Sequence, residues 1–584
     1  MQQHGMTTPA AATMQTAAQE IANAPRRAWR PGIWFQATLL LLLAVCAFLG
    51  SWLNQYSYDD IPLIPGNPDV QSLAHWPRLF LQSYWHNIDT GGLYRPVTML
   101  SFALGWHFRP NDPTAYHAAN IALHGLTAVL VMLLARGWLS DGASFAAGAW
   151  FALTPLHVEV VAGLVGRSEI LSTLFMLIAL LCAWRAFEET QAAASWGWGL
   201  ATACSTLLAL GSKETAIATL ALVPLLQFCR PGARDGRRGS GWREGLGRPV
   251  VWLTALSGAG YMAVRWHVAG LLTGTIRFEV NPLAFAGVAG RVRTALWISG
   301  LNLWAMVWPF HLSPDYSYDQ IPVILRWSDP HFVLAVLLWG AVCAWLLVAV
   351  AGYGRRGAVL FGAAVMVLTY LPVSNLLVPI GTIRAIRLLY APSVGAALLL
   401  GVAWQSVSTR LPARRMRAAL LVPVFILGAV YALSDWRESA YWEDNGTLFS
   451  LGVRRAPRSS HMHAARSAAL FEVGRMDEGI AELQTAVALD PRYPQAWGRL
   501  ADVLEHRGRS VEARHAYHQA LRLEPTADLC RRLLQMDLAA SRAADVLADQ
   551  PFCKPPLNPE AIAAIQQAHA RLKPAATASA LPRP

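Results

Sequence analysis

Long apolar runs recur from residue 33 to residue 434, and they limit the possible folds of this chain more than any other feature. A helix of about twenty apolar residues matches the thickness of a bilayer's hydrocarbon core. Hydrophobic residues make up 54% of the sequence and charged residues only 14%, against about 25% charged in an ordinary soluble domain. Residues 33–436 are therefore predicted to form an all-α, polytopic membrane domain.

Arginine-rich segments between the runs set the predicted orientation, because basic loops stay on the cytoplasmic side of a membrane. The eleven predicted spans cover residues 33–53, 115–136, 143–157, 169–187, 196–212, 214–229, 250–270, 331–352, 357–377, 387–405 and 418–434. The apolar segment 284–310 is predicted to be interfacial or re-entrant, because a further crossing there would place Arg355 and Arg356 outside. This count puts the N-terminus in the cytoplasm and the C-terminus outside the plasma (inner) membrane.

Three segments outside the spans have distinct compositions. Residues 1–32 are rich in Ala, Thr and Gln and are predicted to be a disordered cytoplasmic leader. The run that follows is interpreted as an uncleaved helix, because no small-residue cleavage site comes after it. Residues 54–113 form a polar outer loop, with interfacial pieces expected near 70–86 and 96–108. The net charge of +12 is scattered over loops, which argues against nucleic-acid binding and is consistent with contacts to membrane lipids.

After residue 436 the sequence becomes charged and alanine-rich, and proline recurs every 34 residues. The prolines are Pro457, Pro491, Pro525 and Pro559. A 34-residue period with a glycine between two helices is typical of tetratricopeptide (TPR) repeats. A TPR domain is predicted over 437–550, with repeats at 457–490 and 491–524 and a degenerate third at 525–550. Such repeats stack into a concave surface that binds peptides or proteins.

The end of the chain is less clearly patterned. Residues 551–584 are rich in Pro and Ala and are predicted to be disordered. Cys530 and Cys553 lie beyond the second repeat, and their spacing permits a disulfide without requiring one.

Two adjacent carboxylates, Asp59 and Asp60, follow the first span directly. A carboxylate costs several kcal/mol inside hydrocarbon, so the pair is expected at the outer water interface. There an aspartate can take a proton from an acceptor hydroxyl, and two carboxylates can also ligate Mg²⁺ or Mn²⁺. The dipeptide alone is more typical of a solvated loop, so a catalytic role depends on the other polar motifs.

The segment around the acidic pair has an echo elsewhere in the chain. Tyr-Ser-Tyr-Asp-Asp-Ile-Pro-Leu-Ile at 56–64 resembles Tyr-Ser-Tyr-Asp-Gln-Ile-Pro-Val-Ile at 316–324. Both segments lie outside in the predicted topology, so the two loops either pack together at one site or are similar by chance.

Further ionisable residues lie at the predicted outer ends of spans. Charges at this depth line polar cavities or pair with one another. Arginine and lysine there either bind a lipid phosphate or extend to headgroups. The candidate phosphate-binding residues are Arg95, Arg167, Lys213, Arg384 and Arg387, and the candidate site-lining residues are His157, Glu159, Glu169, Glu214 and Tyr390. The spacing of these residues does not match a protein metal site.

Taken in order, these motifs resemble those of one known family. They are Tyr58-Asp59-Asp60, Tyr94-Arg95-Pro96, Tyr116-His117 with Asn120 and His124, Pro155-x-His157-x-Glu159, Gly166-Arg167-Ser168-Glu169, Ser212-Lys213-Glu214, Ser313-Pro314-Asp315 and Arg387-x-x-Tyr390-x-Pro392-Ser393-x-Gly395. The chain is similar to the transmembrane and TPR-containing protein O-mannosyltransferases and their bacterial relatives over about residues 55–525. Each motif is weak alone, but their shared order is specific.

The resemblance implies a GT-C glycosyltransferase fold followed by a TPR solenoid. It also implies transfer of a sugar, usually mannose, from a polyprenyl-phosphate donor to Ser or Thr of exported proteins, with Asp59 and Asp60 as the catalytic pair. The TPR surface would present the acceptor protein. Two alternatives remain open: transfer to a lipid or an envelope glycan, and a non-catalytic membrane scaffold that gathers envelope-assembly partners through its repeats.

Overall fold

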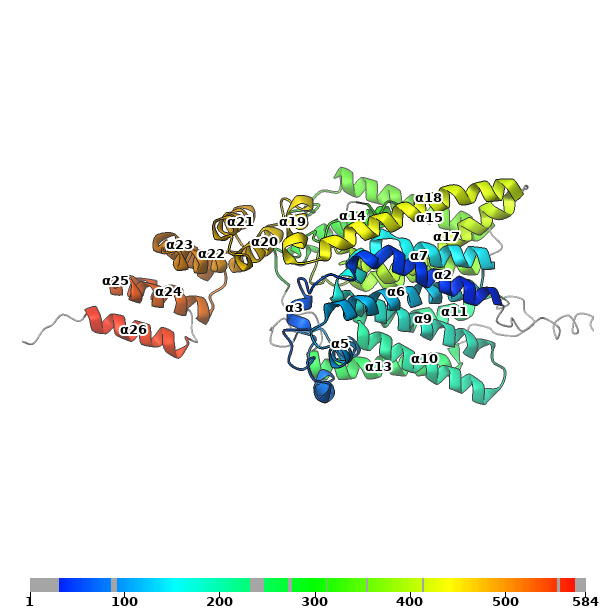
Figure 1. Cartoon of the computed structure of the whole chain (residues 1–584), viewed down its shortest axis with the longest axis horizontal. Helices are drawn as coiled ribbons and strands as arrows, with labels where there is room; N and C mark the ends of the chain where they lie inside the picture. The colour runs from blue at the N-terminus through cyan, green and yellow to red at the C-terminus, as the bar shows by residue number, and fades with distance from the viewer. Residues whose placement is uncertain are drawn as a thin grey trace, which may run out of the picture.

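The computed structural model describes residues 31–85, 92–231, 246–270, 276–310, 312–352, 356–411, 414–553 and 557–572. Within these ranges the chain is helical, and two helical parts lie end to end (Figure 1). The larger part is a bundle of long helices that run side by side. The TPR helices extend from one end of it, next to α3 (Asp60–Leu63) and α19 (Asn445–Arg455). Most of the predicted leader, 1–32, lies outside the described residues.

Each of the eleven predicted spans overlaps one α-helix of the bundle. These helices are α2 (Pro31–Phe48), α6 (Pro113–Ala135), α7 (Asp141–Leu153), α9 (Arg167–Glu188), α10 (Ala192–Ser212), α11 (Thr219–Cys229), α13 (Pro249–Ala269), α15 (Pro330–Gly352), α16 (Arg356–Tyr370), α17 (Tyr390–Arg410) and α18 (Arg414–Ser439). Six of the helical segments are long and apolar enough to cross a membrane, or seven if the bent pair Asp141–Leu153 and Pro155–Ala162 is one span. The chain is therefore a multi-pass membrane protein, and the count of eleven crossings stays a prediction.

The core of the bundle is built from small and branched apolar side chains. Ala128, Val131 and Ala147 are fully buried between α6 and α7, where alanine allows the two helices to approach closely. Gly148 makes this contact tighter still, because a Cβ at this residue would lie 3.0 Å from the Ala128 carbonyl oxygen. The outer surface of the bundle carries exposed aromatic and aliphatic side chains, among them Trp252 at 66% exposed, as expected for contact with lipid.

The segment predicted to be interfacial or re-entrant, 284–310, contains one continuous helix, α14 (Val288–Val307). It lies in the half of the bundle that is nearer to the TPR helices (Figure 1). Arg293 donates hydrogen bonds to the carbonyl oxygens of Ile324 (3.1 Å) and Leu325 (2.8 Å). Asn302 donates to the hydroxyl of Tyr370 (2.9 Å), at the end of α16. These contacts fix α14 to the end of α16 and to the segment that carries Ile324 and Leu325.

A second predicted interfacial piece is also a helix, α5 (Pro96–Phe108). Its start is set by Pro96, which favours the first turn of a helix. The rings of Phe102 and Tyr116 pack at a centroid distance of 6.2 Å and join α5 to α6. The outer loop is thereby fixed on the bundle rather than left as a free linker.

The TPR part consists of antiparallel helix pairs. They are α20 (Ser460–Glu472) with α21 (Met476–Leu489), α22 (Pro494–His506) with α23 (Ser510–Leu523), and α24 (Ala527–Ala539) with the short α25 (Ala543–Asp549). Gly474 and Gly508 have φ of +77° and +72°, the left-handed conformation that ends a helix at little cost for glycine. Ser541 takes the same conformation (φ +60°), one residue short of the 34-residue frame. The third repeat therefore also contains two helices joined by a turn.

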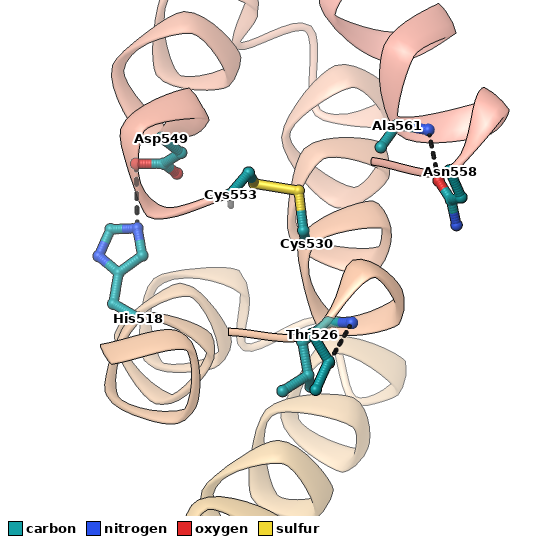
Figure 2. The surroundings of a disulfide bond; sticks show 8 residues. His518, Thr526, Cys530, Asp549, Cys553, Asn558 and Ala561 are labelled. Atoms are coloured by element: carbon teal, nitrogen blue, oxygen red, sulfur yellow. Dashed lines mark hydrogen bonds and ion pairs between the residues drawn. A yellow bond between two sulfur atoms is a disulfide. The ribbon is translucent and has the colours of Figure 1, made fainter. Parts of the chain in front are cut away.

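A disulfide between Cys530 and Cys553 closes the third repeat (Figure 2). Their Cα atoms are 5.4 Å apart, within the normal range for a disulfide. The bond joins α24 to the segment after α25 and closes a loop with a sequence separation of 23 residues. A cross-link of this length stabilises a fold by about 3 kcal/mol in the chain-entropy account.

The prediction that residues 551–584 are disordered is wrong for part of that segment. Helix α26 (Pro559–Leu572) buries Ala561, Ala564 and Ala568 against the third repeat. Its start is capped by Asn558, which accepts a hydrogen bond from the backbone N–H of Ala561 at 2.9 Å (Figure 2). Composition was misleading here, because the alanines are spaced at i, i+3 and i+7 and form a packing face.

Candidate active site

The loop that carries the acidic pair is fastened to the chain segment that leaves the bundle toward the TPR part. Three hydrogen bonds make this connection: Asn54 to Ser439 (2.9 Å), Gln55 to Glu443 (2.8 Å) and Tyr58 to Asn445 (2.8 Å). Tyr58 has a φ of +52°, and this turn directs the chain into the short helix α3. Such a conformation costs a bulky residue about 1–2 kcal/mol, so the surrounding contacts must hold it.

Asp60 is buried, at 1% exposed, and its carboxylate is fully used within the fold. One oxygen accepts from the backbone N–H of Val165 (2.9 Å) and the other from that of Ser57 (3.3 Å). Burial raises the pKa of Asp60 to about 7, although these N–H groups act to lower it. Asp60 thus ties the outer loop to the turn before α9, and its oxygens do not face an open site.

Asp59 is in a different environment from its neighbour. It is partly exposed, and its side chain makes no hydrogen bond or ion pair within the described ranges. Burial raises the pKa of Asp59, while the positive charges of Arg387 and His461 act to lower it. Of the two aspartates, Asp59 is the one whose carboxylate is available to an incoming group.

Glu159 and Arg387 form an ion pair beside Asp59. Glu159 accepts one hydrogen bond from the Arg387 guanidinium and another from its backbone N–H (3.0 Å). The side chain of Glu159 is 8% exposed, whereas that of Arg387 is 35% exposed. Only Nη1 of Arg387 is engaged by a side chain in the part of the chain that the structure describes. The remaining donors of its guanidinium fork are suited to a phosphate.

Two more ion pairs lie near Arg387, and their cations are more deeply buried than Arg387 itself. Lys213 pairs with Glu169, and Arg95 pairs with Glu214 at 3.0 Å. The charges of Arg95 and Arg387 both act on Lys213. Three of the five predicted phosphate-binding cations therefore converge, each already paired with a carboxylate.

Arg167 and Arg384 do not share this arrangement. Arg167 is 3% exposed and donates to Asn120 (2.7 Å) and to the carbonyl oxygen of Tyr116 (2.8 Å). Arg384 donates to Asn302 (2.8 Å) and stacks over the Tyr316 ring at 4.3 Å. The structure does not support a phosphate-binding role for Arg167, because its donors hold α5, α6 and α9 together. Arg384 fixes α14 to the loop before α17.

His157 and Tyr390, which were predicted to line the site, lie in the bundle core instead. Both are fully buried, and their rings are 4.6 Å apart. His157 is hydrogen-bonded to the Phe151 carbonyl oxygen and to Ser393, each at 2.9 Å. With both ring nitrogens engaged, His157 holds α7 against α17.

A narrow pocket of about 30 Å³ opens beside Glu159. Its walls include Ser313 from the second outer loop and Glu438 and Arg455 from the segment that leads to the TPR part. This volume accommodates one or two water molecules. The pocket therefore lies between Glu159 and the segment that leads to the TPR part.

Sequence reasoning missed His461 and Asp315 as site residues. His461, on α20, forms an ion pair with Asp315 at 3.7 Å, and its charge acts on Asp59. Asp315 belongs to the Ser313-Pro314-Asp315 motif, but the sequence predicted no role for it. The echo between the two outer loops was the available signal, since both loops reach His461.

The described residues do not fit the divalent cation that the acidic pair suggested. They contain no group of three or more His, Cys, Asp or Glu side chains placed to hold a metal ion. Both oxygens of Asp60 accept from backbone N–H groups, which leaves a single free carboxylate at this position.

Family models match two segments of the chain. The model described as "Protein O-mannosyl-transferase TMTC, DUF1736" matches residues 278–343, and a tetratricopeptide-repeat model matches residues 470–536. The first segment contains α14 and the second outer loop, so it includes Asp315, which forms the ion pair with His461.

Curated proteins of this family align with most of the chain. The human protein O-mannosyl-transferase TMTC4 is 28% identical over 477 residues, which are 74% of this chain and 63% of that protein. Tmtc1 of Drosophila melanogaster is 26% identical over 568 residues, with coverage of 83% and 61%. Mouse TMTC2 is 24% identical over 556 residues, with coverage of 82% and 61%. The chain thus spans about three fifths of the length of these relatives.

Solved structures of low similarity also align with the chain. The Archaeoglobus fulgidus oligosaccharyltransferase with a tethered acceptor peptide aligns with a TM-score of 0.41 and 11% identity, covering 71% of this chain and 56% of that one. ArnT from Cupriavidus metallidurans bound to undecaprenyl phosphate aligns with a TM-score of 0.35 and 14% identity, covering 85% and 80%. The resemblance predicted from the order of the motifs is confirmed: this chain is similar to the TMTC protein O-mannosyl-transferases in both its membrane part and its TPR repeats.

Proposed function

We propose that this protein is a GT-C-type membrane glycosyltransferase that moves a sugar, mannose, from a polyprenyl phosphate to a Ser or Thr hydroxyl of an exported protein. One observation carries the proposal. Asp59 presents a carboxylate without a hydrogen-bond partner in the described ranges, next to an arginine with free guanidinium donors. The named activity of the similar proteins supports the same reaction class.

In this proposal Asp59 acts as the general base. Its carboxylate takes the proton from the acceptor hydroxyl as the hydroxyl oxygen attacks the anomeric carbon. The bond between that carbon and the phosphate oxygen breaks, and its electron pair leaves with the phosphate. A single displacement of this kind inverts the anomeric centre. Asp60 holds the loop in place through Ser57 and Val165 and does not take part directly.

Arg387 binds the leaving phosphate in this scheme. About a third of its side chain is exposed, and its fork can engage phosphate oxygens while Nη1 stays on Glu159. Lys213 and Arg95 add positive potential near Arg387, although each forms an ion pair with a carboxylate. Negative charge that develops on the leaving group is therefore stabilised by groups that are already in position.

The TPR part is proposed to lie outside the plasma membrane and to present the acceptor chain. The disulfide between Cys530 and Cys553 supports this placement, because such bonds persist in oxidising compartments and are rare in the cytosol. The repeats begin next to the loop of Asp59, so an acceptor held along them would reach the site (Figure 1).

The test is a transfer assay with the purified full-length protein, labelled polyprenyl-phosphate mannose and an acceptor protein with exposed Ser and Thr. Asp59→Asn is expected to lower the transfer rate by about 100-fold or more, the usual effect of losing a general base. The variant should fold, because Asp59 makes no hydrogen bond that asparagine would lose. Unchanged transfer by Asp59→Asn would refute the proposal.

Asp319→Asn is the matched control, since Asp319 holds the same place in the echoing loop and lies 4.0 Å from Arg458 at an exposed position. Its rate is expected to stay within about twofold of the wild-type rate. Two outcomes would favour the other functions. Label that appears only in lipid or glycan identifies a different acceptor. A deletion phenotype that Asp59→Asn rescues fully indicates a scaffold.

A further inference from the structure

Both outer loops meet the first TPR helix at its N-terminal end. From the second loop, Tyr318 accepts a hydrogen bond from the backbone N–H of Ser460 (3.4 Å), and Asp315 accepts from the Ser459 hydroxyl (2.7 Å). From the first loop, the Tyr58 ring packs against the His461 ring at a centroid distance of 6.2 Å. The start of α20 is therefore held on two sides by segments of the membrane part.

His461 lies at the centre of this contact, among acidic groups from different elements. Asp315 forms the ion pair at 3.7 Å, and the charges of Glu279 and Asp59 also act on the imidazole. The ring of Tyr58, which carries a further titratable group, also packs against the imidazole. Burial acts to lower the pKa of His461, but the three carboxylates outweigh it and raise that pKa above its usual value. The ring thus keeps its proton to a higher pH than an ordinary histidine does.

Asp315 is suited to hold this charge. Burial acts to raise its pKa, but His461 and the hydroxyls of Ser317 and Ser459 outweigh burial and lower it. Asp315 also lies at the N-terminal end of α20, where the helix dipole favours an anion. Asp315 therefore stays ionised and keeps the imidazole in place.

We propose that His461, which the TPR part supplies, is a positioning residue of the catalytic site. It holds the loop of Asp59 in place and puts a positive charge beside it. This inference rests on the proposed function. Asp59 has two cations near it, and they come from different parts of the molecule: Arg387 from the bundle and His461 from the first repeat. Docking of the repeats thus completes the electrostatic environment of the base, and the TPR part is more than a platform for the acceptor.

The rate of sugar transfer should depend on the protonation of His461. A histidine with a raised pKa is charged below its ordinary pKa and loses that charge as pH rises through the raised value. Transfer by the wild-type protein is therefore expected to fall on the alkaline side as His461 loses its proton. Because the His461 charge lowers the pKa of Asp59, removing it should move the acidic limb of the profile to higher pH.

The experiment compares His461→Gln with His463→Gln in the full-length protein. His463 lies two residues further along α20, is hydrogen-bonded to Glu482 and to the Pro457 carbonyl oxygen (3.1 Å), and does not face the loop of Asp59. In the transfer assay from pH 5 to 9, His461→Gln is expected to lower kcat by about tenfold, with KM for the lipid donor within about threefold of wild type. Its alkaline limb should be absent, and its acidic limb should lie at higher pH. His463→Gln should keep the wild-type profile.

A second measurement does not depend on activity. Amide hydrogen exchange over residues 57–64 is expected to be faster in His461→Gln than in His463→Gln or wild type, because the loop loses its contact with α20. If the wild-type protein transfers no sugar, the proposed function fails while this measurement still tests the positioning role. A His461→Gln profile parallel to wild type, or unchanged exchange over 57–64, overturns the inference.

Discussion

The two outer loops, 56–64 and 316–324, share more than a sequence echo. In each loop the backbone N–H at the fifth position bonds to the carbonyl oxygen at the second: Asp60 to Ser57 and Gln320 to Ser317, both at 3.0 Å. The side chain at the fifth position also plays the same part in both. Asp60 accepts from the N–H groups of Ser57 and Val165, and Gln320, with its amide oxygen facing α20, accepts from those of Arg458 (3.0 Å) and Ser459 (2.9 Å).

The loops differ at the fourth position, where each has an aspartate. Asp59 is placed among Arg387, Glu159 and His461, while the side chain of Asp319 is 38% exposed and, among the described residues, pairs with Arg458 alone, at 4.0 Å. The same backbone hydrogen bond therefore closes a turn whose aspartate has several charged neighbours in one loop and a single arginine beside it in the other. The comparison teaches that the motif closes each loop with the same hydrogen bond, and that the surrounding elements decide whether the aspartate can do chemistry.

The largest difference between the loops is expected from removing the arginine that faces each aspartate. Arg387→Gln leaves Glu159, at 8% exposed, without its cation, so apparent stability should fall by about 3 kcal/mol. This value is at the low end for a broken buried pair, because a third of Arg387 is exposed. Thermal unfolding in detergent measures the effect.

Arg458→Gln is the matched change in the second loop. Its ion pair with Asp319 is long and solvated, so it should cost less than about 1 kcal/mol. Equal destabilisation by the two variants would show that the two aspartates lie in equivalent surroundings. That result would contradict the difference drawn between the two loops. A double variant, Arg387→Gln with Glu159→Gln, should recover part of the lost stability, because no unpaired charge then remains buried.

A smaller contrast is expected at the fifth position. Asp60→Ala leaves the backbone N–H groups of Ser57 and Val165 without an acceptor in a buried place, which should cost about 2–3 kcal/mol. Gln320→Ala removes acceptors from two N–H groups at the start of α20, where water has partial access, and should cost about 1 kcal/mol. Thermal unfolding again measures both. A larger loss of stability from Gln320→Ala would mean that the contact with the TPR part contributes more to stability than the hydrogen bonds of Asp60.

Much of the fold followed from local sequence patterns. Apolar runs of bilayer length predicted the long helices, and a 34-residue proline period predicted the repeats, because both signals lie within a single element. The third repeat was harder to recognise because Ser541 replaces the usual glycine and lies one residue out of frame. Helix α26 was missed because its alanines were taken as low-complexity composition rather than as a packing face.

The site was only partly predictable, for a tertiary reason. Nothing local distinguishes Arg167 from Arg387, since both follow apolar segments at an outer loop; their roles are set by Asn120 in one case and Glu159 in the other. Likewise, Asp60 differs from Asp59 by its hydrogen bonds to Ser57 and Val165, and Val165 lies far away in the sequence. His461 has no neighbouring motif at all, and its importance depends on how the first repeat docks.

The smallest expected effect comes from giving the second loop the charge of the first, by Gln320→Glu. A glutamate can accept from the same two N–H groups, and its charge at the N-terminal end of α20 should contribute about 0.5–1 kcal/mol. Repulsion from Asp315 and Asp319 should offset a similar amount, so net stability should change by less than about 0.5 kcal/mol. Any gain should be present at pH 8 and lost as the glutamate becomes protonated at low pH, which unfolding at pH 8 and pH 5 measures. A loss above about 1 kcal/mol at pH 8 alone would show that repulsion dominates, and that the second loop requires an uncharged residue where the first tolerates an acid.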